Sequence, residues 1–443
     1  MVLKYSDFMQ MVITNHPVSK AARLMVDRGA MAEQQARGNF DPKLFGVYDQ
    51  KFFESKNYFA LLNSGLKIPT WYGIEFKGGY ETNNGVFLND ENTTPSSGLW
   101  YAGISIPVGQ GLFIDERRAA LRKAKLINQA SLSQQILAQN ELCYDAGKAY
   151  WDWFLAFNQQ RIAIEAYNAT NQRLQAVVES ERAGDRSKVD TLEASIQMQE
   201  RYVSMLQSRI ELNNKTLWLS TFIWNDNDEP LQINDNLVAP DYAAAEQEFD
   251  KMLPPNLNDT GAINNHPLIY YYQVELRKLR IDQELKSEKL KPVVDLNYNL
   301  LQNNANINNL NTENYKWGVS VGFPIFIRKE RAELKLAKIK VKEVELDLEN
   351  KRVQLNNKLQ MGVRELEIVT DQVNFYGKTL TDQMSLLNAE RSLFDAGESN
   401  LFMINARESA YINASNKYVD LISKKYKAAL FTAYSLGMIS QMK

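Results

Sequence analysis

Cysteine and histidine are scarce in this chain. Its 443 residues include one cysteine, Cys143, and two histidines, His16 and His266. A single cysteine forms neither an internal disulfide nor a thiolate metal cluster, and its place in a helical pattern indicates a small buried apolar residue. Each histidine precedes a proline, and we expect Asn15 and Asn265 to cap helices that begin at these prolines. Because the two histidines hold equivalent places in a repeat, we expect them to lie far apart and predict no metal site.

Long apolar runs and an excess of one charge are also lacking. No stretch reaches the ~18 to 20 apolar residues that a membrane-spanning helix needs, which argues against a helical membrane protein. The start of the chain lacks the apolar core of a secretory signal, so we expect either a cytoplasmic protein or one whose leader has been removed. The formal net charge of −2 argues against a nucleic-acid partner.

Motifs of catalysis are missing as well. The chain has neither a Gly-rich phosphate loop nor a G-x-S-x-G nucleophile turn. We therefore predict no catalytic residue, no bound cofactor and no enzymatic activity, and we expect the function to depend on shape.

The chain does contain an internal repeat. Asn15-His16-Pro17 returns 250 residues later as Asn265-His266-Pro267, and Ala183-Gly184 returns 213 residues later as Ala396-Gly397. Such a repeat indicates two copies of one structural unit that pack on each other. The displacements differ because the first copy holds about 37 extra residues between Pro42 and Arg118.

Two proline-free stretches, 115–183 and 328–396, predict helices of roughly 100 Å, which need lateral partners. In the second stretch apolar residues recur every seven positions, the spacing of a coiled-coil seam, with one four-residue step that locally unwinds the supercoil. These residues are Leu334, Val341, Leu348, Leu355, Leu359, Leu366, Val373, Leu380, Leu387 and Phe394. Polar residues such as Asn128 and Gln160 interrupt the same seam in the first stretch, so we expect a wall with one wet face.

Each long helix is expected to end at a glycine in the left-handed conformation, Gly184 or Gly397. Ser187 and Asn400 are placed to cap the helices that follow them. Each copy therefore predicts a helical hairpin with unequal arms.

Ahead of each long helix the period of the pattern changes to two. Residues 293–301 alternate between apolar and polar, and 317–324 continue the alternation after the Asn-rich turn 303–314, which predicts a β-hairpin. The counterparts in the first copy are 44–53, 72–80 and 100–107. Aromatics near the ends of such strands are typical of a membrane β-barrel, although an ordinary soluble sheet fits the period equally well.

The order of helix, strands, long helix, glycine turn and return helix, present twice, resembles the TolC-like outer-membrane efflux family of bacteria over essentially the whole chain. The Asn-His-Pro openings, the breaks at Pro42 and Pro292, and the turn sequences 184–190 and 397–401 carry the resemblance. It implies an α+β membrane protein in which three protomers contribute four strands each to one outer-membrane β-barrel, continued by a long periplasmic α-helical barrel. Closure would leave no strand edge open to lipid.

The expected organisation has two structural repeats and a linker. The first repeat is 1–224, with a short helix, strands at about 43–108 and a helical hairpin at 115–222 whose tip lies near 184. The linker is 225–262. The second repeat is 263–443, with a helix, strands at about 293–327 and a helical hairpin at 328–437 whose tip lies near 397.

The resemblance implies the outer-membrane exit duct of a tripartite efflux pump, which passively conducts small toxic compounds from periplasm to exterior. The implied partners are two further copies of the chain, a periplasmic adaptor protein, an inner-membrane transporter and outer-membrane lipid. The implied location is the outer membrane, reaching into the periplasm, with the signal peptide removed. A type I protein-secretion duct is a near alternative, and a structural coiled-coil scaffold is one of a different class. The insertion at about 53–98 stays open between an external loop, an inward plug and a periplasmic extension.

In this family the hairpin tips form the periplasmic mouth, where they narrow the tunnel and meet the adaptor. The tip and adaptor-contact candidates are Gly184, Asp185, Ser187, Asp190, Phe394, Gly397, Glu398, Asn400 and Met403. Three copies of Asp190 would form a ring of charges that filters cations, and a solvated helix-capping acid is the other reading. Phe394 and Met403 depart from the polar pattern of the family, so we expect a mouth constricted partly by packing and dewetting.

Overall fold

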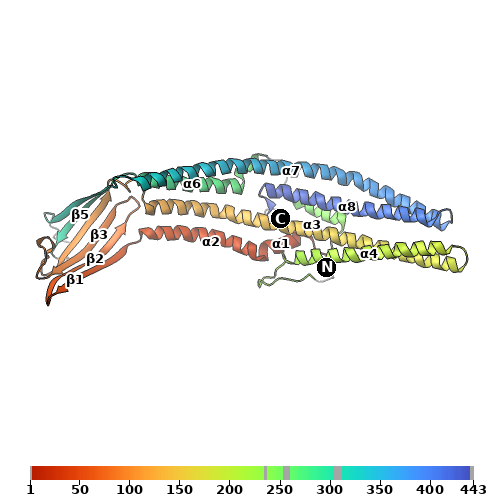
Figure 1. Ribbon diagram of the computed structural model, residues 1–443, viewed down its shortest axis with the longest axis horizontal. Helices are drawn as coiled ribbons and strands as arrows, with labels where there is room; N and C mark the ends of the chain where they lie inside the picture. The colour runs from red at the N-terminus through yellow and green to blue at the C-terminus, as the bar shows by residue number, and fades with distance from the viewer. Residues whose placement is uncertain (1, 234–236, 253–259, 304–311, 440–443) are drawn as a thin grey trace. The chain divides into compact units, whose positions relative to one another are not determined.

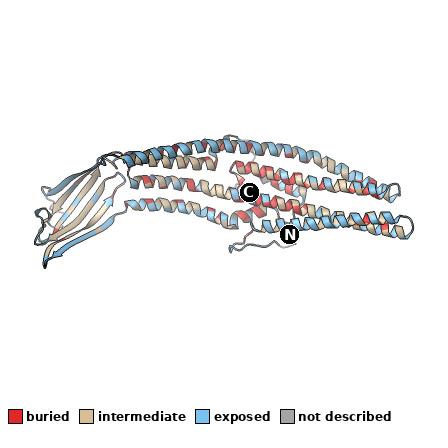
Figure 2. Cartoon of the chain, viewed as in Figure 1, coloured by how far each residue is buried: buried red, intermediate tan, exposed pale blue. Residues whose placement is uncertain are grey.

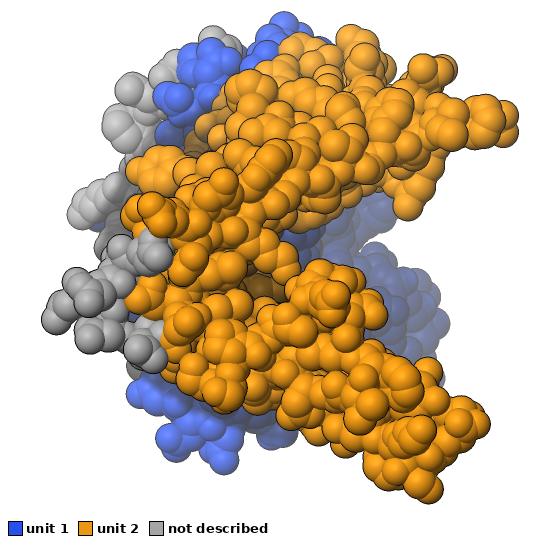
Figure 3. Space-filling view, turned by 90° about the vertical axis from the view of Figure 1, so that its left-hand side faces the viewer, with its two compact units in different colours: residues 1–25, 133–269, 350–443 blue, residues 26–132, 270–349 orange. Residues whose placement is uncertain are grey.

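The computed structural model describes residues 2–233, 237–252, 260–303 and 312–439. The chain divides into two compact units, and each takes residues from both halves of the sequence (Figure 3). Unit 1 consists of residues 1–25, 133–269 and 350–443, and unit 2 of residues 26–132 and 270–349. The predicted linker and the predicted Asn-rich turn lie partly outside the described residues.

Unit 2 contains one antiparallel sheet of six strands in sequence order, β1 to β6 (Figure 1). The strands are Lys43–Phe53, Lys56–Pro69, Glu75–Asn84, Leu99–Pro107, Val293–Gln302 and Tyr315–Gly322. The two halves of the sequence meet inside the sheet, because β4 pairs with β5 and places Ala102 opposite Leu300.

The expectation of four strands per chain is wrong. The insertion at about 53–98 forms two strands of the same sheet, of which β3 overlaps the strand expected at 72–80 and β2 was not expected. β1 turns into β2 at Glu54 and Ser55, whose φ angles are 50° and 59°. Two successive left-handed residues match the twist of a two-residue hairpin, but Asn and Gly usually occupy them. Because Asn and Gly are absent from this turn, the strand at 56–69 was not predicted from the sequence.

Four helices connect to the strands in unit 2. They are α2 (Pro17–Arg37), α3 (Glu116–Arg182), α6 (Pro267–Glu288) and α7 (Arg328–Asp395). Three polar contacts between neighbours place their unit 2 segments in one layer in this order: Asn128 donates to Glu33 at 2.8 Å, Lys123 pairs with Asp282 at 3.3 Å, and Lys286 pairs with Glu333 at 2.8 Å. The helices of this layer thus follow the order of the strands to which they are joined.

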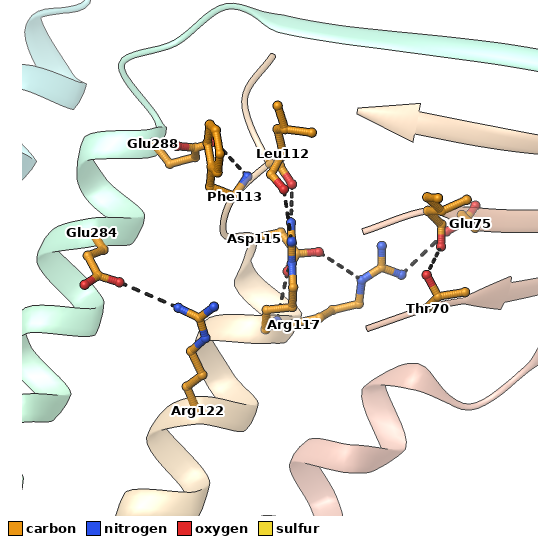
Figure 4. A network of polar contacts seen from close by, with 12 residues as sticks. Thr70, Glu75, Leu112, Phe113, Asp115, Arg117, Arg122, Glu284 and Glu288 are labelled. Carbon is orange, nitrogen blue, oxygen red and sulfur yellow. Dashed lines mark hydrogen bonds and ion pairs between the residues drawn. The ribbon is translucent and has the colours of Figure 1, made fainter. Parts of the chain in front are cut away.

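A polar network holds the passage from β4 into α3 (Figure 4). Asp115 caps α3 by accepting the backbone N–H of Arg118 at 2.9 Å, and the Arg118 guanidinium donates to Asp115 at 3.0 Å and to the carbonyl of Leu112 at 3.0 Å. Arg117 reaches Glu75 of β3 at 3.5 Å. Burial raises the pKa of Asp115, but the hydrogen bonds and charge of Arg118 outweigh burial and leave that pKa below its usual value. The network therefore fixes the direction in which α3 leaves the sheet.

Buried residues gather along α3 and along α8, which spans Leu401–Ser435 (Figure 2), and in unit 1 many of them are aromatic. This aromatic core forms where α1 (Tyr5–Asn15) and α5 (Tyr242–Met252) pack on the unit 1 parts of α3 and α8. Trp151 stacks on Tyr426 with ring centroids 4.1 Å apart. Cys143 lies in this core, where burial raises the pKa of its thiol to about 12. The prediction of a small buried residue at this position is confirmed.

The seven-residue seam predicted on α7 is confirmed over most of its length. Six of its ten positions are buried, namely Val341, Leu348, Leu355, Leu359, Val373 and Leu387. Within the described part of the chain, every helix falls short of the length and apolarity that a membrane crossing demands.

The histidines themselves, rather than the asparagines before them, cap α2 and α6. Nδ1 of His16 accepts the backbone N–H of Val18 at 3.2 Å, and Nδ1 of His266 accepts that of Leu268 at 3.1 Å. Asn15 instead donates its amide to a backbone carbonyl 3.1 Å away. The predicted cap was therefore one residue off, because a neutral imidazole nitrogen accepts a hydrogen bond as a side-chain oxygen does.

His266 predicts acid sensitivity. It is 4% exposed, and burial lowers its pKa to about 4, whereas an unfolded histidine titrates at ~6.5. Between these two pKa values the unfolded chain binds a proton that the folded chain does not. The contribution of His266 to the free energy of unfolding is therefore complete above the unfolded pKa. It falls, by on the order of 3 kcal/mol, as the pH drops toward the folded pKa. His266→Asn keeps an acceptor and removes the titration, so its Tm should fall less than that of the parent between about pH 7 and about pH 4.5. An equal fall of the Tm in both proteins would contradict the assignment of acid sensitivity to His266. The matched control is His16→Asn, which changes a less buried histidine and should have a smaller effect.

Candidate functional site

The two hairpin turns of unit 1 share one backbone construction. Gly184 and Gly397 have φ angles of 88° and 77°. The residue after each glycine, Asp185 or Glu398, donates its backbone N–H to the carbonyl five residues earlier, at 2.9 Å and 2.8 Å respectively. This is the Schellman motif, which requires a left-handed residue and explains the glycine in both turns.

Side-chain caps begin the helix after each turn. Oγ of Ser187 accepts the N–H of Asp190 at 3.2 Å, and the Asp190 carboxylate accepts the N–H of Ser187 at 3.1 Å, which makes a capping box at the start of α4 (Lys188–Ser220). Asn400 accepts the N–H of Met403 at 2.9 Å at the start of α8. The Asp190 carboxylate is thus engaged by its own helix, as the capping reading expects, and the ring of three Asp190 charges stays a prediction.

Phe394 connects the two turns. The Arg186 guanidinium lies over its ring, 4.7 Å from the centroid, an arrangement that attracts a cation to the aromatic face. The ring also packs on a small buried cluster formed by Val177, Ala194, Leu401 and Ile404. Sequence reasoning singled out Phe394 but missed Arg186, its partner from the first hairpin.

Phe402 is a further tip residue that sequence reasoning missed. It is exposed, next to the partly exposed Met403. The sequence could have indicated Phe402, because it is a large apolar residue in the first turn of the helix that Asn400 caps. The first turn of a surface helix is usually polar or acidic.

A buried polar cluster joins the two hairpins next to the tips. Arg173 of α3 forms an ion pair with Glu408 of α8 and donates to Asn405 at 2.9 Å. Arg391 of α7 approaches Glu408 at 3.3 Å, and Asn405 donates to Glu193 of α4 at 3.4 Å. These residues, named here the Arg173–Glu408 clasp, tie four helices together.

The clasp was also missed from the sequence, although a signal exists. Glu408 follows Leu401 and Ile404 at helical spacing, on the face of α8 that is buried. An acidic residue on an apolar stripe needs a paired cation, because an unpaired buried charge is very costly. The sequence could therefore have indicated a partner for Glu408, but not which arginine provides it.

Comparison with known proteins points to one family. Residues 261–430 match the model of the family described as outer membrane efflux protein. No curated protein matches the sequence.

Solved structures of outer-membrane channels share the fold of the chain. The CmeC outer membrane channel of Campylobacter jejuni is 12% identical and aligns over 98% of this chain and 85% of its own, with a TM-score of 0.68. VceC of Vibrio cholerae is 12% identical and aligns over 98% and 96%, with a TM-score of 0.67. The open state of the MtrE outer membrane channel of Neisseria gonorrhoeae is 13% identical and aligns over 98% and 88%, with a TM-score of 0.67.

At these identities the structural likeness establishes the fold, and the family match covers residues 261–430. The proteins concerned are channels rather than enzymes. Together the two findings confirm the resemblance seen in the sequence: residues 261–430 match the outer membrane efflux protein family, and the chain as a whole has the fold of TolC-like outer-membrane channels.

Proposed function

We propose that this chain, as a homotrimer, is the outer-membrane exit duct of a tripartite efflux pump and passively conducts small toxic compounds from the periplasm to the exterior. The observation that carries the proposal is the division of the sheet into an apolar and a polar face. On one face the strand register aligns Leu44, Tyr48, Leu62, Leu66, Ile68, Phe76, Tyr80, Trp100, Ala102, Ile104, Ile106, Val294, Leu296, Tyr298, Leu300, Tyr315, Trp317, Val319 and Val321.

The opposite face of the same strands is more polar, and it also holds Phe45, Val47, Leu61, Leu99 and Leu301. It carries Asp49, Asn63, Lys67, Glu75, Lys77, Glu81, Ser105, Asp295, Asn297, Asn299, Lys316 and Ser320. An exposed apolar surface of this extent needs a covering partner, and a barrel wall meets the need with lipid outside and water inside.

Aromatic side chains support a membrane position for the sheet. Tyr80 packs on Trp100, with ring centroids 5.0 Å apart, and Tyr298 on Tyr315 at 5.9 Å, all on the apolar face. Trp100 and Tyr315 lie at the strand ends away from the helices, and Tyr80 and Tyr298 lie in the middle of β3 and β5. A second exposed set, Trp71, Tyr72, Phe323 and Phe326, lies at the helix end of the sheet. Two such girdles are typical of the two interfaces of an outer-membrane barrel.

Two exposed heptad seams support the homotrimer. On α4 the seam is Val189, Leu192, Ile196, Val203, Leu206, Ile210 and Leu217, with exposed fractions between 38% and 72%. On α7, behind the buried seam, Ile339, Leu346, Val353, Met361, Ile368 and Phe375 are 53% to 75% exposed. Seams of this spacing bury themselves against another helix, and a threefold ring of chains would supply that helix.

In this proposal the hairpin tips form the periplasmic mouth, and the exposed tip residues Asp185, Glu398 and Phe402 meet a periplasmic adaptor that leads to an inner-membrane transporter. The trimer spans the outer membrane and reaches into the periplasm, without enzymatic activity of its own. The Arg186 guanidinium on Phe394 holds the two turns of each chain together at the mouth.

The duplication belongs to the same proposal, with repeats 1–224 and 263–443 joined by 225–262. Matching details of local structure support it. Both openings place a histidine as the cap of a helix that starts with proline, and both hairpins turn through a Schellman glycine. Local devices repeated at equivalent places are expected from one ancestral unit.

The test of the proposed function combines the mass of the detergent-solubilised protein with its current in a planar lipid bilayer. A trimer that forms stable channels is expected. A water-soluble oligomer without conductance would reject the duct and favour a coiled-coil scaffold.

Opening the mouth by side-chain truncation gives a separate prediction. Phe394→Ala with Met403→Ala removes apolar volume at the tips, so single-channel conductance should rise, on the order of twofold if dewetting limits the current. Phe402→Ala is the matched control, because it removes an aromatic ring from the same tip without touching the Arg186 contact. Unchanged conductance of the double variant would contradict an apolar constriction formed by Phe394 and Met403.

A further inference from the structure

We propose that the outer-membrane barrel of this protein has eighteen strands and is as wide as the helical tunnel that it continues. It therefore admits polymer-sized molecules from outside, and the size limit of the duct lies at the periplasmic mouth alone. The inference rests on the proposed homotrimer, since three chains of six strands each give eighteen.

The inserted strands are compatible with a closed barrel because they come as a pair. All neighbours in the sheet are antiparallel, so strand direction alternates from β1 to β6. The two edge strands thus run in opposite directions, and β6 of one chain can pair with β1 of the next in the same antiparallel manner. An odd insertion would have placed parallel strands at each joint between chains, whereas this pair leaves a uniform ring.

The circumference of such a ring matches the helices joined to it. Four helices per chain, packed ~8–10 Å apart, give a ring of twelve with a circumference of roughly 100–120 Å. Eighteen strands spaced ~4.8 Å apart and tilted by ~40° give roughly 110 Å, whereas twelve strands would give only about 75 Å. The extra hairpin therefore removes the narrowing that four strands per chain would impose.

The polar face of the sheet keeps its side chains close to the wall. The Tyr101 ring lies across Gly79, where a Cβ would come within 2.8 Å of it, and its hydroxyl donates to Asn63 at 2.9 Å. Asn299 lies against Gly103 in the same manner, at 2.1 Å from a hypothetical Cβ. Glycines covered by neighbouring side chains are a device of curved sheets. Here they allow the side chains of Tyr101 and Asn299 to lie against the sheet.

With eighteen strands, the periplasmic mouth limits the size of the molecules that pass, and the barrel does not. A barrel of about 18 strands leaves an open aqueous channel, and barrel diameter grows roughly linearly with strand number. The outer-membrane segment would be about 1.5 times as wide as one built from twelve strands. Molecules on the outer side can then enter the barrel up to the size of the helical tunnel.

The test measures polymer entry from the external side of single channels. Neutral polyethylene glycols of increasing size are added to that side only, for the parent and for a variant in which a short turn replaces residues 54–98. The variant joins β1 directly to β4, which are antiparallel already, and leaves four strands per chain. We expect its largest admitted polymer to have about two thirds of the radius found for the parent. Polymers added to the periplasmic side report the mouth and should give one cut-off for both proteins.

Three outcomes separate this inference from the proposed function. Trimeric channels with one external cut-off for parent and variant would overturn the wide barrel and leave the duct intact. If the variant does not assemble, strand number is counted in an electron cryomicroscopy map of the parent, where eighteen strands support the inference and any smaller barrel overturns it. A parent that forms no trimer and no channel would overturn both proposals.

Discussion

Replacing Ile196 and Ile210 of α4 with aspartate is expected to convert the trimer into monomers. Both side chains belong to the exposed α4 seam, at 47% and 61% exposure. Burying an isoleucine contributes ~1.5–3 kcal/mol, and a threefold assembly repeats each contact three times. Aspartate removes that contribution and also costs several kcal/mol if its charge is forced out of water.

Sedimentation of the detergent-solubilised variant measures the outcome directly. The fold of the chain should persist, as judged by helical circular dichroism, because neither side chain belongs to the buried core. Ser204→Asp, compared with Ile210→Asp alone, is the matched control: it adds the same charge at an exposed position of α4 outside the seam. A seam variant that stays trimeric, or a control that dissociates equally, would show that the α4 seam is not the contact between chains.

Removing Glu408 is expected to loosen the hairpins next to their tips. The side chains of Arg173 and Glu408 are only 10% and 7% exposed, so Glu408→Ala leaves a buried arginine without its carboxylate. Breaking a buried pair from one side costs ~3–5 kcal/mol. Because the clasp ties all four helices, amide hydrogen exchange should speed up around residues 170–180 and 401–410, and the Tm should fall.

Two comparisons isolate the clasp. Glu179→Ala removes the partner of Arg182 in an ion pair whose side chains are 72% and 71% exposed, and little change is expected because exposed pairs contribute little. Arg173→Met with Glu408→Met replaces the buried pair with apolar side chains and should recover much of the lost stability. Equal effects of Glu408→Ala and Glu179→Ala would refute the structural role of the clasp.

The helical part of the fold could be predicted because its signals are local. The α7 seam, the glycine turns and the caps at Ser187 and Asn400 each depend on a few neighbouring residues, and the structure places them as the pattern indicated. β2 could not be predicted in the same way, because its turn uses Glu54 and Ser55, which carry no usual signal for two left-handed residues.

At the hairpin tips too, local features could be predicted from the sequence and contacts between distant segments could not. The residues of the two turns were found from spacing, whereas Arg186 on Phe394 and Arg173 on Glu408 join segments more than 200 residues apart. A heptad seam likewise looks the same in sequence whether its partner is the same chain or another copy. The exposure of the α4 seam became visible only in the folded chain.

The measurement that tests the central claim most directly is thiol modification of the sheet during current recording. The only native cysteine, Cys143, is buried with a pKa of about 12, so it contributes almost no reactive thiolate. Cysteines are placed one at a time at Ser105 and Asn297 on the polar face, and at Ile104 and Leu296 on the apolar face. A charged, water-soluble thiol reagent should reduce the current through channels that carry Ser105→Cys or Asn297→Cys and leave the apolar-face variants unchanged. Equal modification of both faces, or a block from the apolar face alone, would contradict a water-filled barrel with lipid outside.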